Sequence, residues 1–86
     1  MEHSEVVRRF ATAADWGACV RQVRRARGWD QAQLARVCGV SRMTISRLER
    51  GEDVSVVTAI RALSECGYSV TVAQKRARVV VEDFHG

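Results

Sequence analysis

Apolar residues recur at helical spacing through most of the chain. In the segment 13–27, Trp16, Val20 and Val23 are separated by four and three positions, the spacing that places side chains on one face of an α-helix. Further segments with helical spacing lie between a candidate capping residue and a glycine: 31–38, 42–50 and 56–66. In the last of these segments Val56, Ala59, Ile60 and Leu63 share one side, and Val37 belongs to the apolar face of the first, so these residues are expected to face the core. The pattern predicts a helical domain over residues 13–67.

Polar residues that cap helices stand ahead of these segments. The side chains of Thr12, Asp30 and Ser41 can accept hydrogen bonds from the free N–H groups of a first helical turn. Asp30 is followed three residues later by a glutamine, the arrangement of a capping box. The last helix has two candidate caps, Asp53 and Ser55. Glycine favours the left-handed conformation that ends a helix, so the expected stops are Gly28, Gly39, Gly51 and Gly67.

The first twelve residues form an N-terminal extension. After Ser4, the side chains of Val6, Val7 and Phe10 fit one and a half turns of an additional helix. We therefore expect an all-α domain of four or five helices.

The pattern changes after residue 67. Tyr68, Val70 and Val72 alternate with polar residues, which is typical of a β-strand with one buried face. A lone strand leaves its backbone groups unpaired, so a second copy of the chain is its expected partner. The segment 68–86 is thus expected to mediate dimerisation, and residues 74–86 are either a second strand or a disordered tail.

The charge is positive and unevenly placed. The chain has 86 residues, enough for one domain, and 14 Lys and Arg against 10 Asp and Glu give a net charge of +4. Thirteen of the basic residues are Arg, and ten of these lie in the first fifty positions. Residues 51–67 are net acidic. A polyanion is therefore expected to bind the first fifty residues.

Little in the sequence points to catalysis or metal binding. The three cysteines are widely spaced and the two histidines stand near the chain ends, so no metal site or cofactor is expected. No paired carboxylates or activated nucleophile can be assembled, and we expect no catalytic residues and no enzyme activity. No apolar run reaches the length of a membrane span, and a cytoplasmic location is expected.

The segment 28–51 has the layout of a helix–turn–helix. Its two short helices are joined by a turn in which Gly39 allows the bend and Val40 fills the angle between them. In the second of these helices, Ile45 and Leu48 form the inner face. The outer face carries charged, hydroxyl and thioether groups that suit base edges in a major groove about 12 Å wide: Arg42, Met43, Ser46, Arg47 and Arg50.

This segment resembles the helix–turn–helix of the Cro/phage-repressor type, also called the XRE family. The resemblance rests on Gly28-x-x-Gln31-x-x-Leu34-Ala35, then Gly39-Val40-Ser41, then Thr44-Ile45-Ser46-x-Leu48-Glu49-x-Gly51. It extends over the flanking helices, roughly residues 13–67, and implies a lambda-repressor-like fold. It also implies a homodimeric transcriptional repressor that binds double-stranded operator DNA at an inverted repeat.

The resemblance implies roles for individual residues. Gln31 is expected to contact a DNA phosphate and to brace the recognition helix. Arg42 is expected to read guanine with its guanidinium fork, and Met43 to touch a thymine methyl group. Arg24 and Glu49 match a structural ion pair between the first helix and the end of the recognition helix. The other positions expected to face bases or the DNA backbone are Ser41, Ser46, Arg47 and Arg50.

A finer resemblance is to the antitoxin branch typified by HipB, carried by Arg27-Gly28-Trp29 and by the strand-prone run Tyr68–Val72. In that branch the terminal strand pairs with its twin, and the dimer represses its own operon and restrains a toxin. The resemblance implies that Tyr68, Val70 and Val72 line the dimer interface. It leaves residues 1–12 and 79–81 uncovered. The alternatives are a free-standing regulator from a phage or mobile element, and a protein-interaction module whose basic face meets an acidic protein.

Overall fold

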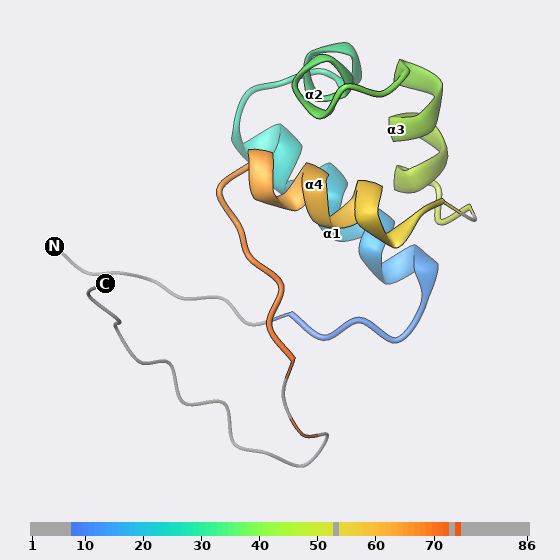
Figure 1. The fold of residues 1–86 in the computed structure, drawn as a ribbon, viewed down its shortest axis with the longest axis vertical. Helices are drawn as coiled ribbons and strands as arrows, with labels where there is room; N and C mark the ends of the chain where they lie inside the picture. The colour runs from blue at the N-terminus through green and yellow to red at the C-terminus, as the bar shows by residue number, and fades with distance from the viewer. Residues whose placement is uncertain (1–7, 53, 73, 75–86) are drawn as a thin grey trace, which may run out of the picture.

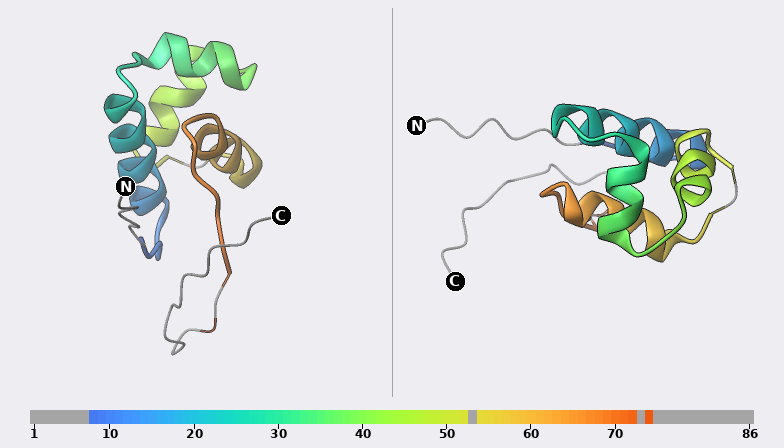
Figure 2. Two further views of the ribbon diagram at one scale, coloured as in Figure 1. Left: turned by 90° about the vertical axis from the view of Figure 1, so that its left-hand side faces the viewer. Right: turned by 90° about the horizontal axis from the view of Figure 1, so that it is seen from above.

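Four α-helices pack around one core in the computed structural model, which describes residues 8–52, 54–72 and 74 (Figure 1). α1 and α4 lie side by side, and α2 and α3 lie across one side of that pair (Figure 2). An all-α architecture is therefore confirmed for the described part of the chain. The helices are α1 (Ala13–Ala26), α2 (Gln31–Cys38), α3 (Arg42–Glu49) and α4 (Val56–Glu65).

The helix ends follow the capping pattern of the sequence. Asp30 Oδ1 accepts a hydrogen bond from the Gln33 backbone N–H at 2.8 Å, and Gln33 Oε1 accepts one from the Asp30 N–H at 2.7 Å, which completes the expected capping box. Thr12 forms a second capping box with Asp15 at the start of α1, and the Ser41 side chain caps α3 by accepting a hydrogen bond from the Thr44 N–H. Ser55 holds the N-cap position of α4 without a side-chain capping bond, and Asp53 lies outside the described residues.

The turn between α2 and α3 depends on Gly39. Its φ of 70° lies in the left-handed region that glycine adopts without steric cost. The Val40 N–H then donates back to the Ala35 carbonyl oxygen at 3.0 Å, which closes the end of α2. The Val40 side chain packs against the core. This turn sets the direction in which α3 leaves α2.

The prediction of an additional N-terminal helix is wrong for the residues that the structure describes. Residues 8–11 are not helical, while residues 1–7 lie outside the described part. The Asp15 carboxylate accepts hydrogen bonds from the backbone N–H groups of Ala11, at 2.8 Å, and Thr12, at 3.0 Å. These backbone donors lower the pKa of Asp15 and occupy N–H groups just ahead of α1. Phe10 instead packs on Trp16, with ring centroids 4.5 Å apart.

The core is built from every helix but not from every expected residue. Val56 and Ile60 were expected on the buried face of α4, and both are exposed. Val37 on α2 is also exposed, at 38%. The face of α4 that packs against α1 and α2 buries Ala59, Ala62 and Leu63. The buried apolar residues are Cys19, Val20, Val23, Leu34, Ala35, Ile45, Leu48, Ala59, Ala62, Leu63 and Cys66.

The expected terminal strand is not formed within the single chain. Residues 68–72 have no strand pairing and are exposed, with Val72 at 94%. The two alternatives expected for residues 74–86 stay untested, because only Gln74 of this segment lies in the described part. Among the helices described, none has the length and apolar character needed to cross a membrane.

Candidate nucleic-acid interface

α3 presents one buried and one exposed face. Ile45 is fully buried and Leu48 nearly so, because their spacing places both on the side that packs against α1 and α2. Met43 on the opposite side is 59% exposed. Apart from Gln31 on α2, the expected DNA-facing residues lie on this opposite side of α3 or at the N-terminal end of the helix. Ser41, Arg42, Met43, Arg47 and Arg50 are exposed there, and Ser46 is half-buried.

The C-terminal end of α3 is held against α1 by backbone contact. Gly17 of α1 is buried, and a Cβ atom at this position would lie 2.3 Å from the Leu48 carbonyl oxygen and 2.8 Å from that of Glu49. Only a residue without a side chain allows this approach. Gly17 therefore brings the last turn of α3 close enough for side chains of α1 to reach Glu49.

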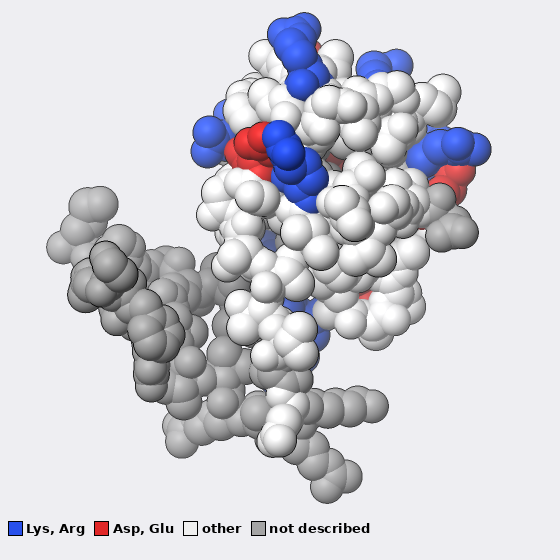
Figure 3. Space-filling model, viewed as in Figure 1, with Lys and Arg blue, Asp and Glu red and all other residues white. Residues whose placement is uncertain are grey.

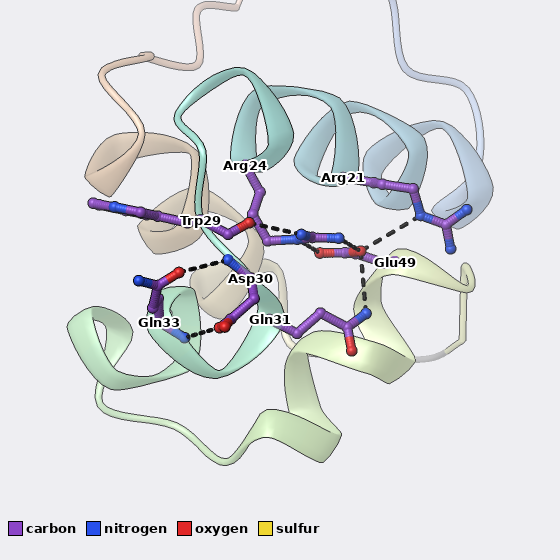
Figure 4. A network of polar contacts seen from close by, with 7 residues as sticks. All are labelled: Arg21, Arg24, Trp29, Asp30, Gln31, Gln33 and Glu49. Carbon is purple, nitrogen blue, oxygen red and sulfur yellow. Dashed lines mark hydrogen bonds and ion pairs between the residues drawn. The ribbon is translucent and has the colours of Figure 1, made fainter.

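Glu49 is the centre of a buried polar network (Figure 4). Arg24 of α1 donates from Nε to Glu49 Oε2 at 2.7 Å and from Nη2 to Glu49 Oε1 at 2.8 Å, a bidentate geometry that gives strong charge-assisted bonds. Arg24 Nη1 also donates to the Trp29 carbonyl oxygen at 2.8 Å. The ion pair thus joins α1, the loop before α2 and the end of α3.

Two further residues reach the same carboxylate. Gln31 Nε2 at the start of α2 donates to Glu49 Oε1 at 3.2 Å, and Arg21 Nε lies 3.5 Å from the same oxygen. Burial by itself would raise the pKa of Glu49, but the hydrogen bonds from Arg24, Gln31 and Arg21 and the charge of Arg24 outweigh it and lower that pKa. The hydrogen bonds that Arg24 donates to Glu49 raise the pKa of Arg24. Both groups are therefore ionised at neutral pH.

The arginines at the end of α3 are paired with a residue that sequence reasoning missed. Glu52 contacts Arg50 Nε at 2.6 Å and Arg47 Nε at 3.5 Å, and Arg50 Nη1 donates to Ser46 Oγ at 2.6 Å. Helical periodicity cannot find Glu52, because it follows the end of α3 and returns to this face only through the turn at Gly51. Within the described residues, Arg42 has no such partner.

Charge is distributed unevenly over the surface. Figure 3 shows basic side chains around the rim of one face, while most of the surface over α4 is uncharged. An Arg61–Glu65 pair on α4, with Arg61 Nη2 3.0 Å from Glu65 Oε1, is the exception. The arginines of α3 and the uncharged surface of α4 are therefore separate features of the molecule.

The cysteines take no part in this interface. Cys19 and Cys66 are buried and Cys38 is partly buried, and all three thiols are free. Burial raises the pKa of each thiol, which makes the reactive thiolate scarce at neutral pH. Among the described residues, no cluster of His, Cys, Asp and Glu could hold a metal ion.

Comparison with known proteins agrees with this geometry. The structure is similar to a HipB chain in a complex of HipA, HipB and O2-O3, with a TM-score of 0.72 and 22% identity over 81% of this chain and 100% of that one. It is also similar to a HipB variant in complex with the O2 20mer, with a TM-score of 0.73 and 24% identity over 83% of this chain and 100% of that one. At such identities the likeness establishes the fold.

A search of curated proteins found no match. The pattern of the helix-turn-helix family matches residues 20–72, which include all of α2, α3 and α4 and the end of α1. The sequence motif, the α2–turn–α3 geometry and this match lead to one assignment: the chain belongs to the XRE-type helix-turn-helix family.

Proposed function

We propose that this chain is a homodimeric, sequence-specific DNA-binding protein that represses transcription from an inverted-repeat operator. The observation that carries the proposal is the construction of α3. Its outer face exposes Arg42, Met43 and Arg47, while its inner face is anchored by Ile45, Leu48 and the buried Glu49. A rigid helix with exposed arginines and little bulk suits a major groove.

In this proposal the exposed side chains divide between bases and backbone. Arg42 lies before the residues that pair with Glu52 and reads guanine at the O6 and N7 atoms of the base. Met43 contacts a thymine methyl group. Ser46, Arg47 and Arg50 contact bases or the flanking backbone. These roles rest on exposure and position along α3, and binding measurements on variants test them.

Two residues, Ser41 and Gln31, are proposed to fix the position of the protein along the DNA backbone. Ser41 Oγ accepts the Thr44 N–H at 3.1 Å and lies 3.0 Å from Thr44 Oγ1. With the Thr44 hydroxyl as the donor of this second bond, the Ser41 hydroxyl proton would meet a phosphate. The Gln31 amide has two N–H groups, of which one meets Glu49. The second would meet a phosphate, so that one side chain links the DNA backbone to the buried network beneath α3.

The homodimer is proposed on a separate set of exposed apolar residues. Val57 is 74% exposed, and Val56 and Ile60 lie beside it on α4. Tyr68, Val70 and Val72 follow and are also exposed. Exposed apolar side chains in this number favour a protein interface. Pairing residues 68–72 with the same segment of a second copy would satisfy the backbone hydrogen bonds of this segment and cover its apolar side chains. Such a dimer would bind two DNA half-sites about 34 to 36 Å apart, or a multiple of that distance.

A role as the antitoxin of a type II toxin–antitoxin operon is the finer form of this proposal. Its support is the likeness of this chain to HipB structures. One of these similar structures is a complex that also contains HipA. The test is to express the product of the gene adjacent to the one for this chain, alone and together with this chain. An antitoxin relieves the growth arrest caused by its toxin, whereas a free-standing regulator has no toxic neighbour to restrain.

DNA titration tests the main proposal. The full chain is titrated by fluorescence anisotropy with a duplex of its own promoter and with a scrambled duplex of the same length, at several salt concentrations. Phosphate contacts make both affinities fall with salt, and base contacts favour the promoter by a factor of about 10³ or more. Equal affinity for the two duplexes at every salt concentration contradicts a sequence-specific repressor.

A further inference from the structure

Glu52 lies at the edge of the outer face of α3, and the backbone holds it there. After α3 ends, the Gly51 N–H donates to the Leu48 carbonyl oxygen at 3.0 Å, and the Glu52 N–H donates to the Arg47 carbonyl oxygen at 3.0 Å. These two bonds turn the chain back along the helix. The Glu52 side chain consequently lies beside α3 and not beyond its end.

The Glu52 carboxylate bridges two arginines. Its Oε2 atom accepts from Arg50 Nε at 2.6 Å, and its Oε1 atom lies 3.5 Å from Arg47 Nε. The hydrogen bond from Arg50, with the charges of both arginines, lowers the pKa of Glu52, so the carboxylate is ionised at neutral pH. A carboxylate and a DNA phosphate offer a guanidinium group the same pair of acceptor oxygens.

We propose that Glu52 limits non-specific DNA binding by occupying the Arg47 and Arg50 guanidinium groups that phosphate oxygens would otherwise take. The inference rests on the proposed DNA-binding function and adds a residue to it. Non-specific affinity comes almost entirely from neutralised phosphates. Glu52 cancels one of the two positive charges at this end of α3, and any phosphate must displace it. Arg42, which has no such partner among the described residues, stays available to read a base.

The substitution Glu52→Gln tests this role, because it removes the charge and keeps the size of the side chain. Affinity for a scrambled duplex is expected to rise by about three- to tenfold at 0.1 M salt. The plot of log affinity against log salt is expected to steepen by about 0.9, the value for one additional positive charge that neutralises a phosphate.

A matched control uses the same substitution on α4. Glu65→Gln removes a carboxylate that pairs with Arg61 at 3.0 Å, and it changes the net charge of the chain by the same amount. Glu65 lies on a helix that is not proposed to touch DNA, so scrambled-duplex affinity and salt slope are expected to stay within twofold of wild type. Circular dichroism of both variants verifies that they are folded, as expected for substitutions at the surface.

Two results with the variants overturn the inference. If Glu52→Gln leaves the scrambled-duplex affinity and salt slope at the wild-type values, or lowers that affinity, Glu52 does not compete with phosphate. An equal increase in Glu65→Gln would attribute the effect to net charge alone. Failure of the proposed function is distinguishable, since it appears in the wild-type chain as equal affinity for promoter and scrambled DNA. A wild-type chain that binds neither duplex overturns both proposals.

Discussion

Replacing Arg24 by methionine isolates the charge of the buried Glu49 carboxylate. The Arg24 side chain is 9% exposed and that of Glu49 is 0% exposed, so neither charge can turn to solvent without moving α1 or α3. Methionine keeps much of the length of the arginine and removes its charge and all three of its hydrogen bonds. The variant leaves a buried carboxylate with Gln31 at 3.2 Å and Arg21 at 3.5 Å.

Breaking a buried ion pair by removing one partner costs about 3 to 5 kcal/mol. Loss of the bidentate contact favours the upper part of this range of energies. The contacts that Gln31 and Arg21 keep with Glu49 reduce the loss towards the lower part. We expect Arg24→Met to lower the free energy of unfolding by about 3 kcal/mol at pH 7. The free energy of unfolding of a native protein is about 5 to 15 kcal/mol. A loss of about 3 kcal/mol is therefore a large fraction of the total and leaves a folded variant whose denaturation can be followed.

The pH dependence of this loss tests its physical origin. In the wild-type chain the pKa of Glu49 is below its ordinary value of 4.5, so its contribution is present above pH 4.5 and is lost as pH falls through the folded-state pKa. Without Arg24, burial is expected to outweigh the remaining hydrogen bonds and to raise the pKa of Glu49 above its ordinary value. Protonation then relieves the cost, and the gap between variant and wild type is expected to narrow steadily as pH falls from 7 towards 4.5.

The assay is urea denaturation followed by circular dichroism, at several pH values and one fixed protein concentration, because the proposed dimer would make stability depend on concentration. Arg25→Met is the control, since Arg25 is the exposed neighbour on α1 and is expected to change stability by less than about 0.5 kcal/mol. A loss in Arg24→Met that is the same at every pH would refute the reasoning, because a purely steric defect does not titrate.

Three further predictions concern the interface, the dimer and the packing of α3. Arg42→Ala is expected to weaken promoter binding by about 1 to 3 kcal/mol and to relax one base position, whereas Arg61→Ala on α4 is not; an unchanged base preference in a binding-site selection removes Arg42 from the reading set. Val70→Asp is expected to give monomers in sedimentation velocity while Thr71→Asp, on the alternate face of the proposed strand, leaves dimers; two dimeric variants contradict strand pairing. Gly17→Ala is expected to lower the free energy of unfolding, measured by urea denaturation, by about 1 to 3 kcal/mol through overpacking, because the new Cβ meets a backbone oxygen that cannot rotate away. This loss is expected even though alanine favours a helix by about 1 kcal/mol relative to glycine. A stabilised variant would show that α1 can shift.

The local structure of the described chain followed from its sequence. Thr12, Asp30 and Ser41 cap helices as expected, and Gly39 ends α2, because capping depends on side chains and backbone groups within a few residues of each other. The inner face of α3 was equally predictable, since helical periodicity alone separates Ile45 and Leu48 from the arginines.

The relation between elements was decided by the tertiary structure. The buried face of α4 departed from expectation at Val56 and Ile60, because the rotation of a helix about its axis depends on what packs against it. Phe10 packs on Trp16 and is not helical, because the Asp15 carboxylate binds the backbone N–H groups just ahead of α1.

The candidate site divides in the same way. The sequence by itself determined which residues share the outer face of α3, and a family resemblance suggested the Arg24–Glu49 pair. Only the tertiary structure brought Gln31 and Arg21 to the Glu49 carboxylate, and turned the chain at Gly51 so that Glu52 lies against Arg47 and Arg50. Contacts of this kind join residues on different elements, or across a turn. Their distances depend on how helices pack, which no periodicity along a single chain encodes.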